Sequence, residues 1–187
     1  MDSNKEIIFL DIDDTIADFT GAMNDALIDY EHYLHPDENL SLESCVQLIK
    51  EISEEEFLFL IEEFDILSKL ELFPDTYDYL KFCYENFKLF FITARKWHMD
   101  SEKITTKWLQ SKNINFDGLI ITDLKDMKGD YILKFKNVKL FVDDKYNQYK
   151  YASDHKIKSL LKTHPCNILS ECPKNHRLDN FKELIRF

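Results

Sequence analysis

The sequence predicts an α/β protein: a Rossmann-like parallel sheet with a small helical insertion after its first strand. Two observations carry this prediction. From residue 74 onward, short apolar runs alternate with amphipathic helical patterns, and a long helical stretch at 16–73 separates the first apolar run from the others. Strands that alternate with helices form a parallel sheet that is covered on both faces. The 187 residues therefore suffice for one core domain, 1–15 and 74–187, and one inserted subdomain, 16–73.

The expected elements follow the chain in order. The apolar run at 5–10 reads as the first, buried strand. The insertion reads as helical throughout, with a candidate capping box formed by Ser53 and Glu56. The later elements are a helix ending near 87, a strand at 88–92, a helix at 98–112, a strand at 118–121, a helix at 129–136, a strand at 138–142, a helix at 145–154, a strand at 157–161 and a short helix near 180–185.

Composition restricts the classes of partner. The chain carries 24 basic and 35 acidic residues, a net charge of −11. Proteins that bind long nucleic acids usually present a basic face, so long DNA or RNA is not expected here. A small phosphorylated substrate remains compatible, because a bound metal and a few cations set the field inside a pocket. No run approaches the ~20 apolar residues of a membrane span, and the N-terminus has no signal-peptide profile, so a cytoplasmic protein is expected.

Reactive side chains follow three of the predicted strands. Asp11 and Asp13 come directly after the first strand, Thr93 and Arg95 follow the strand at 88–92, and the pair Asp143-Asp144 follows the strand at 138–142. The carboxyl ends of parallel strands meet at one edge of the sheet, where open α/β sheets bind their ligands. We therefore expect these groups to converge in one crevice.

The residue types in this crevice suit phosphoryl transfer. One carboxylate can attack phosphorus and form an aspartyl-phosphate, and a second, two residues later, can exchange protons with the leaving group and with water. Mg²⁺, the predicted cofactor, prefers oxygen ligands of this kind. A lysine would neutralise charge on the transferred group. Lys125 and Lys128, which precede the helix leading to the strand at 138–142, are the candidates.

Four short motifs follow one another along the chain: DxDxT, a strand followed by Thr, a Lys, and a strand followed by Asp-Asp. Over roughly 5–165, this order resembles the four motifs of the haloacid dehalogenase-like (HAD) superfamily of phosphatases. The resemblance implies that Asp11 is the nucleophile and that Asp13 is the general acid and base. Asp13 would also offer its backbone carbonyl to Mg²⁺. The insertion would be a small helical cap that closes over the site.

The same resemblance implies roles for the remaining motif residues. Thr93 would bind phosphoryl oxygens, and Lys128 would be the motif lysine, with Lys125 in reserve. Asp143 and Asp144 would complete the metal ligands begun by Asp11 and Asp13. The sequence departs from the superfamily at Asp14, where glycine is usual, which adds a negative charge beside the metal.

Shorter segments resemble one branch of the superfamily, the 5′(3′)-deoxyribonucleotidases. They are 17–19, 92–95, 140–145 and a tail segment at 168–175. The resemblance implies a nucleoside monophosphate substrate. Its binding residues would be Phe19, Thr93, Ala94, Arg95 and Lys128, with Phe19 near the base.

Other functions remain open. The stretch 128–144 also resembles the phosphatase domain of polynucleotide kinases, so a polynucleotide 3′-phosphatase is one alternative and a sugar-phosphate phosphatase is another. A non-catalytic HAD-like binding protein is an alternative of a different class, although it would predict a broken motif and none of the four is broken. The substrate and the oligomeric state remain open.

The cysteines form no CxxC pair, and we expect them to be reduced and mostly buried: Cys45, Cys83, Cys166 and Cys172. Two of them, with His164 and His176, raise a zinc alternative. Their spacing lacks the closely paired ligands of common zinc sites, so ordinary loop and core residues are expected instead.

Overall fold

The computed structural model describes residues 5–34, 53–96 and 99–185. The chain divides into two compact units. The first comprises Met1–Ala17 and Leu72–Phe187, and the second comprises Asp18–Glu71. Part of the predicted insertion, including Cys45, lies outside the described residues.

The first unit is built on a six-stranded parallel sheet with the order β3-β2-β1-β4-β5-β6. The central strand β1 (Ile7–Leu10) pairs with β2 (Lys88–Thr93) on one side and with β4 (Val138–Asp143) on the other. The outer strands are β3 (Gly118–Ile121), β5 (Ser159–Lys162) and β6 (Arg177–Leu178). This arrangement confirms the Rossmann-like α/β prediction.

The strand register brings the three predicted motifs to one edge. Leu10 lies opposite Phe91 on β2 and opposite Val142 on β4. Asp11 therefore leaves the sheet beside the ends of both neighbouring strands. The four residues of β1 are buried, as expected for a strand that is covered on both faces.

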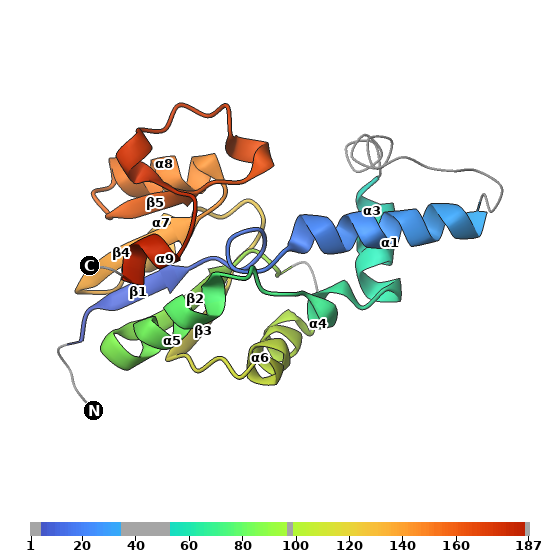
Figure 1. Cartoon of the computed structure of the whole chain (residues 1–187), viewed down its shortest axis with the longest axis horizontal. Helices are drawn as coiled ribbons and strands as arrows, with labels where there is room; N and C mark the ends of the chain where they lie inside the picture. The colour runs from blue at the N-terminus through green and yellow to red at the C-terminus, as the bar shows by residue number, and fades with distance from the viewer. Residues whose placement is uncertain (1–4, 35–52, 97–98, 186–187) are drawn as a thin grey trace. The chain divides into compact units, whose positions relative to one another are not determined.

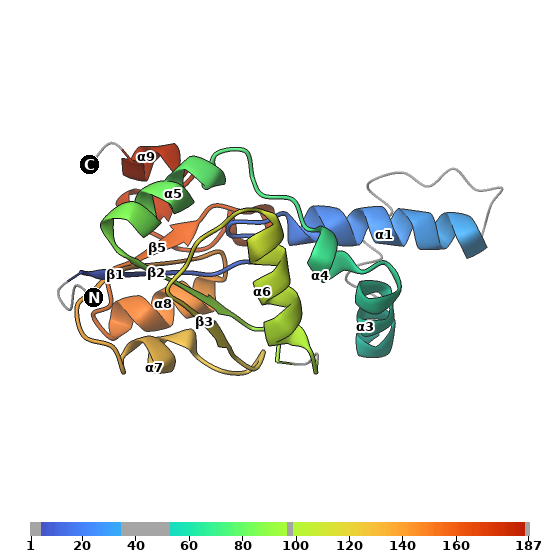
Figure 2. The same ribbon diagram turned by 90° about the horizontal axis from the view of Figure 1, so that it is seen from below.

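Helices cover both faces of this sheet (Figure 2). Helices α5 (Thr76–Asn86) and α9 (Lys182–Ile185) lie on one face, and α7 (Lys128–Ile132) and α8 (Tyr146–Asp154) lie on the other. Helix α6 (Ser101–Ser111) contacts β3.

Aromatic packing fills the space between the layers. On the α7 and α8 face, the Phe9 ring lies 5.3 Å from Phe90 and 5.2 Å from Phe135. On the other face, Tyr79 of α5 stacks on Phe181 at 4.9 Å. This packing holds the sheet rigid. The loops at the carboxyl ends of its strands, which carry the motif residues, are therefore held in place.

The second unit consists, in its described part, of α1 (Phe19–Leu34), α3 (Glu54–Glu63) and α4 (Ile66–Lys69) (Figure 1). The capping box of Ser53 and Glu56 is confirmed. The helix does not continue unbroken, because Asp65 between α3 and α4 has φ 49°, a left-handed conformation that ends the first helix. Ring contacts within this unit include Phe19 against Phe57 at 6.1 Å.

One local prediction is wrong, and three short elements were not predicted. The helix predicted at 129–136 begins at Lys128 and ends at Ile132, and Asn137, with φ 62°, then turns the chain into β4. The tail also contains β6 and two 3₁₀ helices, η1 (Pro165–Asn167) and η2 (Lys174–His176), that were not predicted. Segments of two or three residues are too short to show a period.

The described cysteines are free, but only Cys83 is buried; Cys166 is exposed and Cys172 is half-buried, so the expectation of mostly buried thiols is wrong for the tail. Among the described residues, no helix has the length and apolar character needed to cross a membrane.

Candidate active site

A tight loop after β1 presents Asp11. Its N–H donates to the Val142 carbonyl at 3.0 Å, which ties the loop to β4. The Ile12 carbonyl then accepts hydrogen bonds from the N–H groups of Thr15, Ile16 and Ala17, three to five positions later, at 2.9–3.3 Å. Ile12 is fully buried, so an apolar anchor holds this turn and aims its carboxylates at the edge of the sheet.

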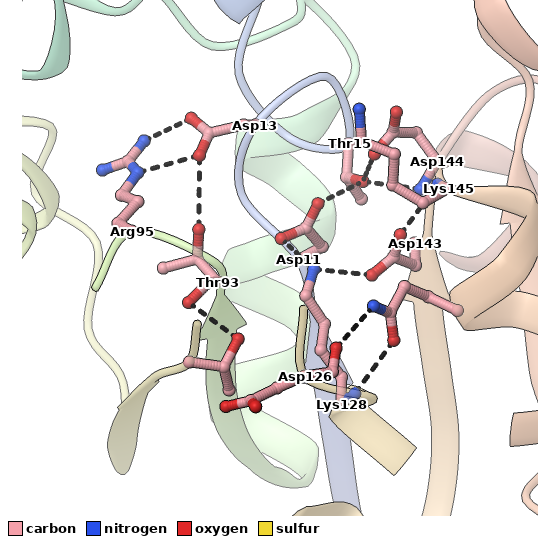
Figure 3. Close-up of polar contacts among 12 residues, drawn as sticks. Asp11, Asp13, Thr15, Thr93, Arg95, Asp126, Lys128, Asp143, Asp144 and Lys145 are labelled. Atoms are coloured by element: carbon pink, nitrogen blue, oxygen red, sulfur yellow. Dashed lines mark hydrogen bonds and ion pairs between the residues drawn. The ribbon is translucent and has the colours of Figure 1, made fainter. Parts of the chain in front are cut away.

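Lys128 lies between two carboxylates (Figure 3). Its Nζ is 2.6 Å from Asp11 Oδ1 and 2.7 Å from Asp143 Oδ2, and all three side chains are buried. The Lys128 N–H donates to Gln148 Oε1 at 2.9 Å, which fixes the start of α7. The alternative, Lys125, is exposed. The structure therefore brings Lys128, not Lys125, to the carboxylates.

Thr15 links Asp11 with Asp144. The Thr15 hydroxyl lies 3.3 Å from Asp11 Oδ2 and 3.3 Å from Asp144 Oδ1, and it accepts a hydrogen bond from the Asp144 N–H at 3.0 Å. Asp143 Oδ1 accepts a hydrogen bond from the Lys145 N–H at 2.8 Å. Backbone and hydroxyl donors thus orient both carboxylates of the Asp143-Asp144 pair.

Asp13 belongs to a separate network (Figure 3). Arg95 donates from Nε to Asp13 Oδ2 at 2.8 Å and from Nη2 to Oδ1. The Thr93 hydroxyl also donates to Asp13 Oδ2, at 3.2 Å. Arg95 is fully buried, and its Nη1 donates to Thr105 at 3.0 Å. Thr93, the last residue of β2, and Arg95, two positions later, therefore hold Asp13 by a hydroxyl and a two-pronged ion pair.

Burial perturbs the ionisation of the inner carboxylates. Desolvation, with Asp143 and Asp13 adding repulsion, raises the pKa of Asp11 to about 7 against the attraction of Lys128. Burial and the charges of Asp143 and Asp11 hold the pKa of Asp144 well above its ordinary value. Burial opposes the charged form of Lys128, but Asp11 and Asp143 outweigh it and raise the pKa of the ammonium.

The donor set fits a hard divalent cation. Asp11, Asp143 and Asp144 each offer an oxygen, these oxygens lie within 4.8 Å of one another, and all three residues are buried. With only Lys128 in ion-pair contact with this set among the described residues, three ionised carboxylates leave an excess of negative charge. Oxygen-only donors are what Mg²⁺ prefers. The residues present therefore fit Mg²⁺.

The structure gathers most of the residues singled out from the sequence. Asp11, Lys128, Asp143 and Asp144 form one group, and Asp13, Thr93 and Arg95 form the adjoining one. Ala94 follows Thr93 directly. Phe19 belongs to the second unit, where it begins α1 and is half-buried.

Three supporting residues were not found from the sequence. Thr15 is the last letter of DxDxT, so a role could have been read from the motif. Gln148 lies in the helix after Asp143-Asp144, where its position is a weak signal. Asn167 is buried in the tail; its Nδ2 donates to the carbonyls of Asp144 at 2.7 Å and Lys162 at 2.8 Å. No local signal marks it.

Comparison with protein families gives a match over nearly the whole chain. The model of the family described as "5' nucleotidase, deoxy (Pyrimidine), cytosolic type C protein" matches residues 5–186. No curated protein matches the chain.

Solved structures share the fold at low sequence identity. A haloacid dehalogenase-like family hydrolase from Streptococcus pneumoniae has a TM-score of 0.68 at 15% identity, covering 97% of each chain. YfnB from Bacillus subtilis, solved bound to magnesium, has a TM-score of 0.66 at 12% identity over 97% of each chain. CbbY from Rhodobacter sphaeroides, solved in complex with phosphate, has a TM-score of 0.64 at 16% identity over 96% of each chain.

Proposed function

Because the chain belongs to the deoxy (pyrimidine), cytosolic type C 5′ nucleotidase family of HAD-superfamily phosphatases, we propose that it is a Mg²⁺-dependent phosphomonoesterase with Asp11 as the nucleophile. The family match confirms the resemblance inferred from the sequence. Because the family is one of phosphatases, the chain is an enzyme. The observation that carries the proposed mechanism is the contact of Lys128 Nζ with Asp11 at 2.6 Å and Asp143 at 2.7 Å, at the ends of adjacent parallel strands.

In the first step, an Asp11 carboxylate oxygen attacks phosphorus, and the bond from phosphorus to the ester oxygen breaks. Asp13 gives its proton to the departing alkoxide. Lys128 neutralises charge on the transferred phosphoryl group, and the Thr93 hydroxyl turns from Asp13 to donate to the phosphoryl oxygens. The products of this half-reaction are the alcohol and an aspartyl-phosphate on Asp11.

In the second step, Asp13 takes a proton from water as the water oxygen attacks phosphorus. The bond to Asp11 then breaks and releases inorganic phosphate. Both Asp13 oxygens accept hydrogen bonds from Arg95, an arrangement that suits this base half of the cycle. For the acid half, one of those bonds must open so that a carboxyl proton can reach the leaving group.

Asp11, Asp143, Asp144 and the Asp13 carbonyl would hold Mg²⁺. When bound, the ion neutralises the excess carboxylate charge and the charge that develops on the phosphoryl oxygens. YfnB, a structural neighbour, was solved bound to magnesium, which supports this choice.

The substrate we propose is a pyrimidine deoxyribonucleoside monophosphate. The description of the family supports this class. The net charge of −11 argues against a polynucleotide end, because affinity for nucleic acids comes mainly from phosphate contacts with Lys and Arg. The second unit would act as the cap and bring Phe19 near the base. A cytoplasmic location stays a prediction.

The test compares kcat/KM for nucleoside monophosphates, sugar phosphates and a 3′-phosphorylated oligonucleotide at one salt concentration, with and without Mg²⁺. We expect a deoxyribonucleoside monophosphate to be the best substrate, chelator to remove activity, and Asp11→Asn to lose turnover by at least about 10³-fold while the protein stays folded.

Each other result has a defined meaning. A preference for the oligonucleotide would establish a polynucleotide phosphatase, and a preference for sugar phosphates would refute the nucleotidase assignment but keep the mechanism. Full activity in excess chelator would refute the Mg²⁺ requirement. Residual activity of Asp11→Asn within about tenfold of wild type would sink the nucleophile assignment.

A further inference from the structure

A second group of ligand-type side chains lies on the outer side of Asp144. Asp144, His164 and Cys166 each offer one donor atom, and these atoms lie within 4.8 Å of one another. Cys166 Sγ is 3.2 Å from His164 Nδ1 and 3.7 Å from Asp144 Oδ2. Unlike the inner group, this one contains a thiol and an imidazole.

The spacing is close to that of a tetrahedral metal site. With metal–ligand lengths of about 2.3 Å for sulfur and 2.0–2.2 Å for nitrogen or oxygen, sulfur should lie about 3.6 Å from each of the other donors. The observed separations of 3.2 and 3.7 Å bracket this value. The His164 and Asp144 donor atoms lie within 4.8 Å of each other, so side-chain shifts would bring all three donors around a cation.

The remaining nitrogen of His164 also has a carboxylate partner. His164 Nε2 is 3.8 Å from Asp14 Oδ1, and both side chains are largely buried. Metal-ligating histidines usually present their second ring nitrogen to a carboxylate or carbonyl, which sets the tautomer and the ring orientation. Asp14, the residue that departs from the superfamily glycine, thus lies where such a supporting group belongs.

We propose that Asp144, His164 and Cys166 form a binding site for Zn²⁺ or a similar borderline-soft cation, with Asp14 as the supporting carboxylate, and that occupation of this site inhibits the enzyme. Thiolate and imidazole favour zinc, whereas the inner oxygen-only set favours Mg²⁺. On binding, the Cys166 thiol releases its proton to solvent and sulfur bonds to the metal. The three protein ligands leave a fourth position for water.

Inhibition follows from the shared ligand and rests on the proposed function. Asp144 Oδ1 faces Thr15 and the inner carboxylates, and Oδ2 faces Cys166. Two cations that share the single charge of Asp144 would repel each other, so Mg²⁺ and zinc would each weaken the binding of the other. The Lys145 ammonium, which interacts electrostatically with Asp144 and Cys166, lowers the affinity of the outer site but leaves its donors in place.

This proposal revises the expectation of ordinary loop and core residues for His164 and Cys166 only. Cys172 and His176 do not join the group: the Tyr149 hydroxyl lies 2.8 Å from His176 Nδ1, and Cys172 Sγ lies 3.6 Å from the Pro173 carbonyl. The sequence spacing between Cys166 and these two residues therefore does not decide whether a metal site exists. The third ligand of the proposed site is Asp144, which directly follows β4.

The site itself is tested with Co²⁺ as a spectroscopic probe on the full, metal-free chain. We expect one equivalent of Co²⁺ to produce a thiolate-to-cobalt charge-transfer absorption. Cys166→Ser should lose it, and Asp14→Gly should weaken Co²⁺ binding by about tenfold or more. Cys172→Ser is the matched control and should keep it. No charge-transfer absorption in the wild type, or its persistence in Cys166→Ser, would overturn the site.

The inhibitory role is tested with Zn²⁺ at constant Mg²⁺, with p-nitrophenyl phosphate as substrate. Cys166→Ser and His164→Gln should keep their activity without zinc, yet need about tenfold more Zn²⁺ for half-inhibition than the wild type or Cys172→Ser. Added Mg²⁺ should also weaken Co²⁺ binding. Equal zinc sensitivity in all four proteins would overturn the shared-ligand role. The Co²⁺ experiment needs no turnover, so failure of the phosphatase proposal would leave its result unaffected.

Discussion

At the scale of single residues, the buried cluster around Lys128 illustrates a balance of charge. The free energy needed to remove a carboxylate from water exceeds the stabilisation that an ion pair with one lysine provides. Here three carboxylates lie near one ammonium. The raised pKa of Asp11, about 7, expresses this imbalance. A divalent cation in the inner site would reverse it, because a nearby positive charge favours the ionised carboxylates.

The first prediction concerns stability without metal. A raised folded-state pKa means that the contribution of Asp11 to stability is present below about pH 4 and is lost as pH rises through about 7. Asp11→Asn cannot ionise. At pH 8, the metal-free variant should melt at least about 2–4 °C above the wild type, the shift that 1 kcal/mol gives in a chain of this size.

At pH 4 this difference should shrink or disappear, and excess Mg²⁺ at pH 8 should reverse it. Differential scanning calorimetry in chelator measures all three conditions. A melting difference that is the same at both pH values would contradict the account of Asp11 ionisation.

Arg95 gives the second prediction. Lysine keeps the charge but cannot reproduce the fork that donates twice to Asp13 and once to Thr105. If Arg95 positions Asp13, Arg95→Lys should lower kcat by roughly 10²-fold with little change in KM, and should alter the pH profile. A rise in KM alone would instead favour the direct substrate contact expected from the sequence.

At the scale of elements, the candidate site depends on the segments that follow strands. The loop after β1, the turn after β2 and the pair that ends β4 supply the reactive groups, and the segment after β5 supports them. Asn167, at the end of η1, donates to the Asp144 and Lys162 carbonyls, and Arg177 of β6 donates to Asn167 Oδ1 at 3.1 Å. The unpredicted tail therefore fastens the loop after β4.

The third prediction tests this support. Asn167→Ala leaves two carbonyls without their donor and Arg177 without one acceptor. We expect a loss of about 2–3 kcal/mol in the free energy of unfolding, measured in urea, because unsatisfied buried groups cost about 1–3 kcal/mol each. Turnover should also fall, since the Asp144 backbone loses its tether. Asn175→Ala, at an exposed site in the same tail, should change neither quantity.

At the scale of the whole molecule, the chain consists of two units joined at adjacent points. Ala17 and Leu72 pair as an antiparallel bridge at the border of the first unit. The Asp18 N–H donates to the Glu71 carbonyl at 3.0 Å at the border of the second. Both ends of the second unit thus meet, a geometry that tolerates insertion or removal of a whole domain.

The fourth prediction is that the first unit folds without the second. A variant in which residues 19–70 are replaced by a short glycine-serine linker should keep its α/β circular dichroism and hydrolyse p-nitrophenyl phosphate. Its preference for a deoxyribonucleoside monophosphate over that compound should fall by about tenfold or more, because lids and caps contribute to substrate choice. An unchanged preference would place specificity in the first unit.

Local pattern was sufficient for much of the fold. The strands at 88–93, 118–121 and 138–143 were predicted within one residue, because short apolar runs between helical patterns identify strands in a covered parallel sheet. Asp65, whose left-handed conformation divides the helical insertion, and the two residues of β6 escaped prediction. A single backbone conformation and a strand of that length leave no periodic signal.

The sequence by itself determined the fold, the family and the residues that meet at the sheet edge. The order of the strands along the chain and the spacing of the motifs can both be read locally. Only the tertiary structure decided their partners. Lys128 meets Asp143 across 15 positions, and Thr15 meets Asp144 across 129. Arg95 pairs with Asp13, and Cys166 approaches the outer face of Asp144. Such contacts depend on how loops from separate strands fold back over the sheet, and no local period encodes that path.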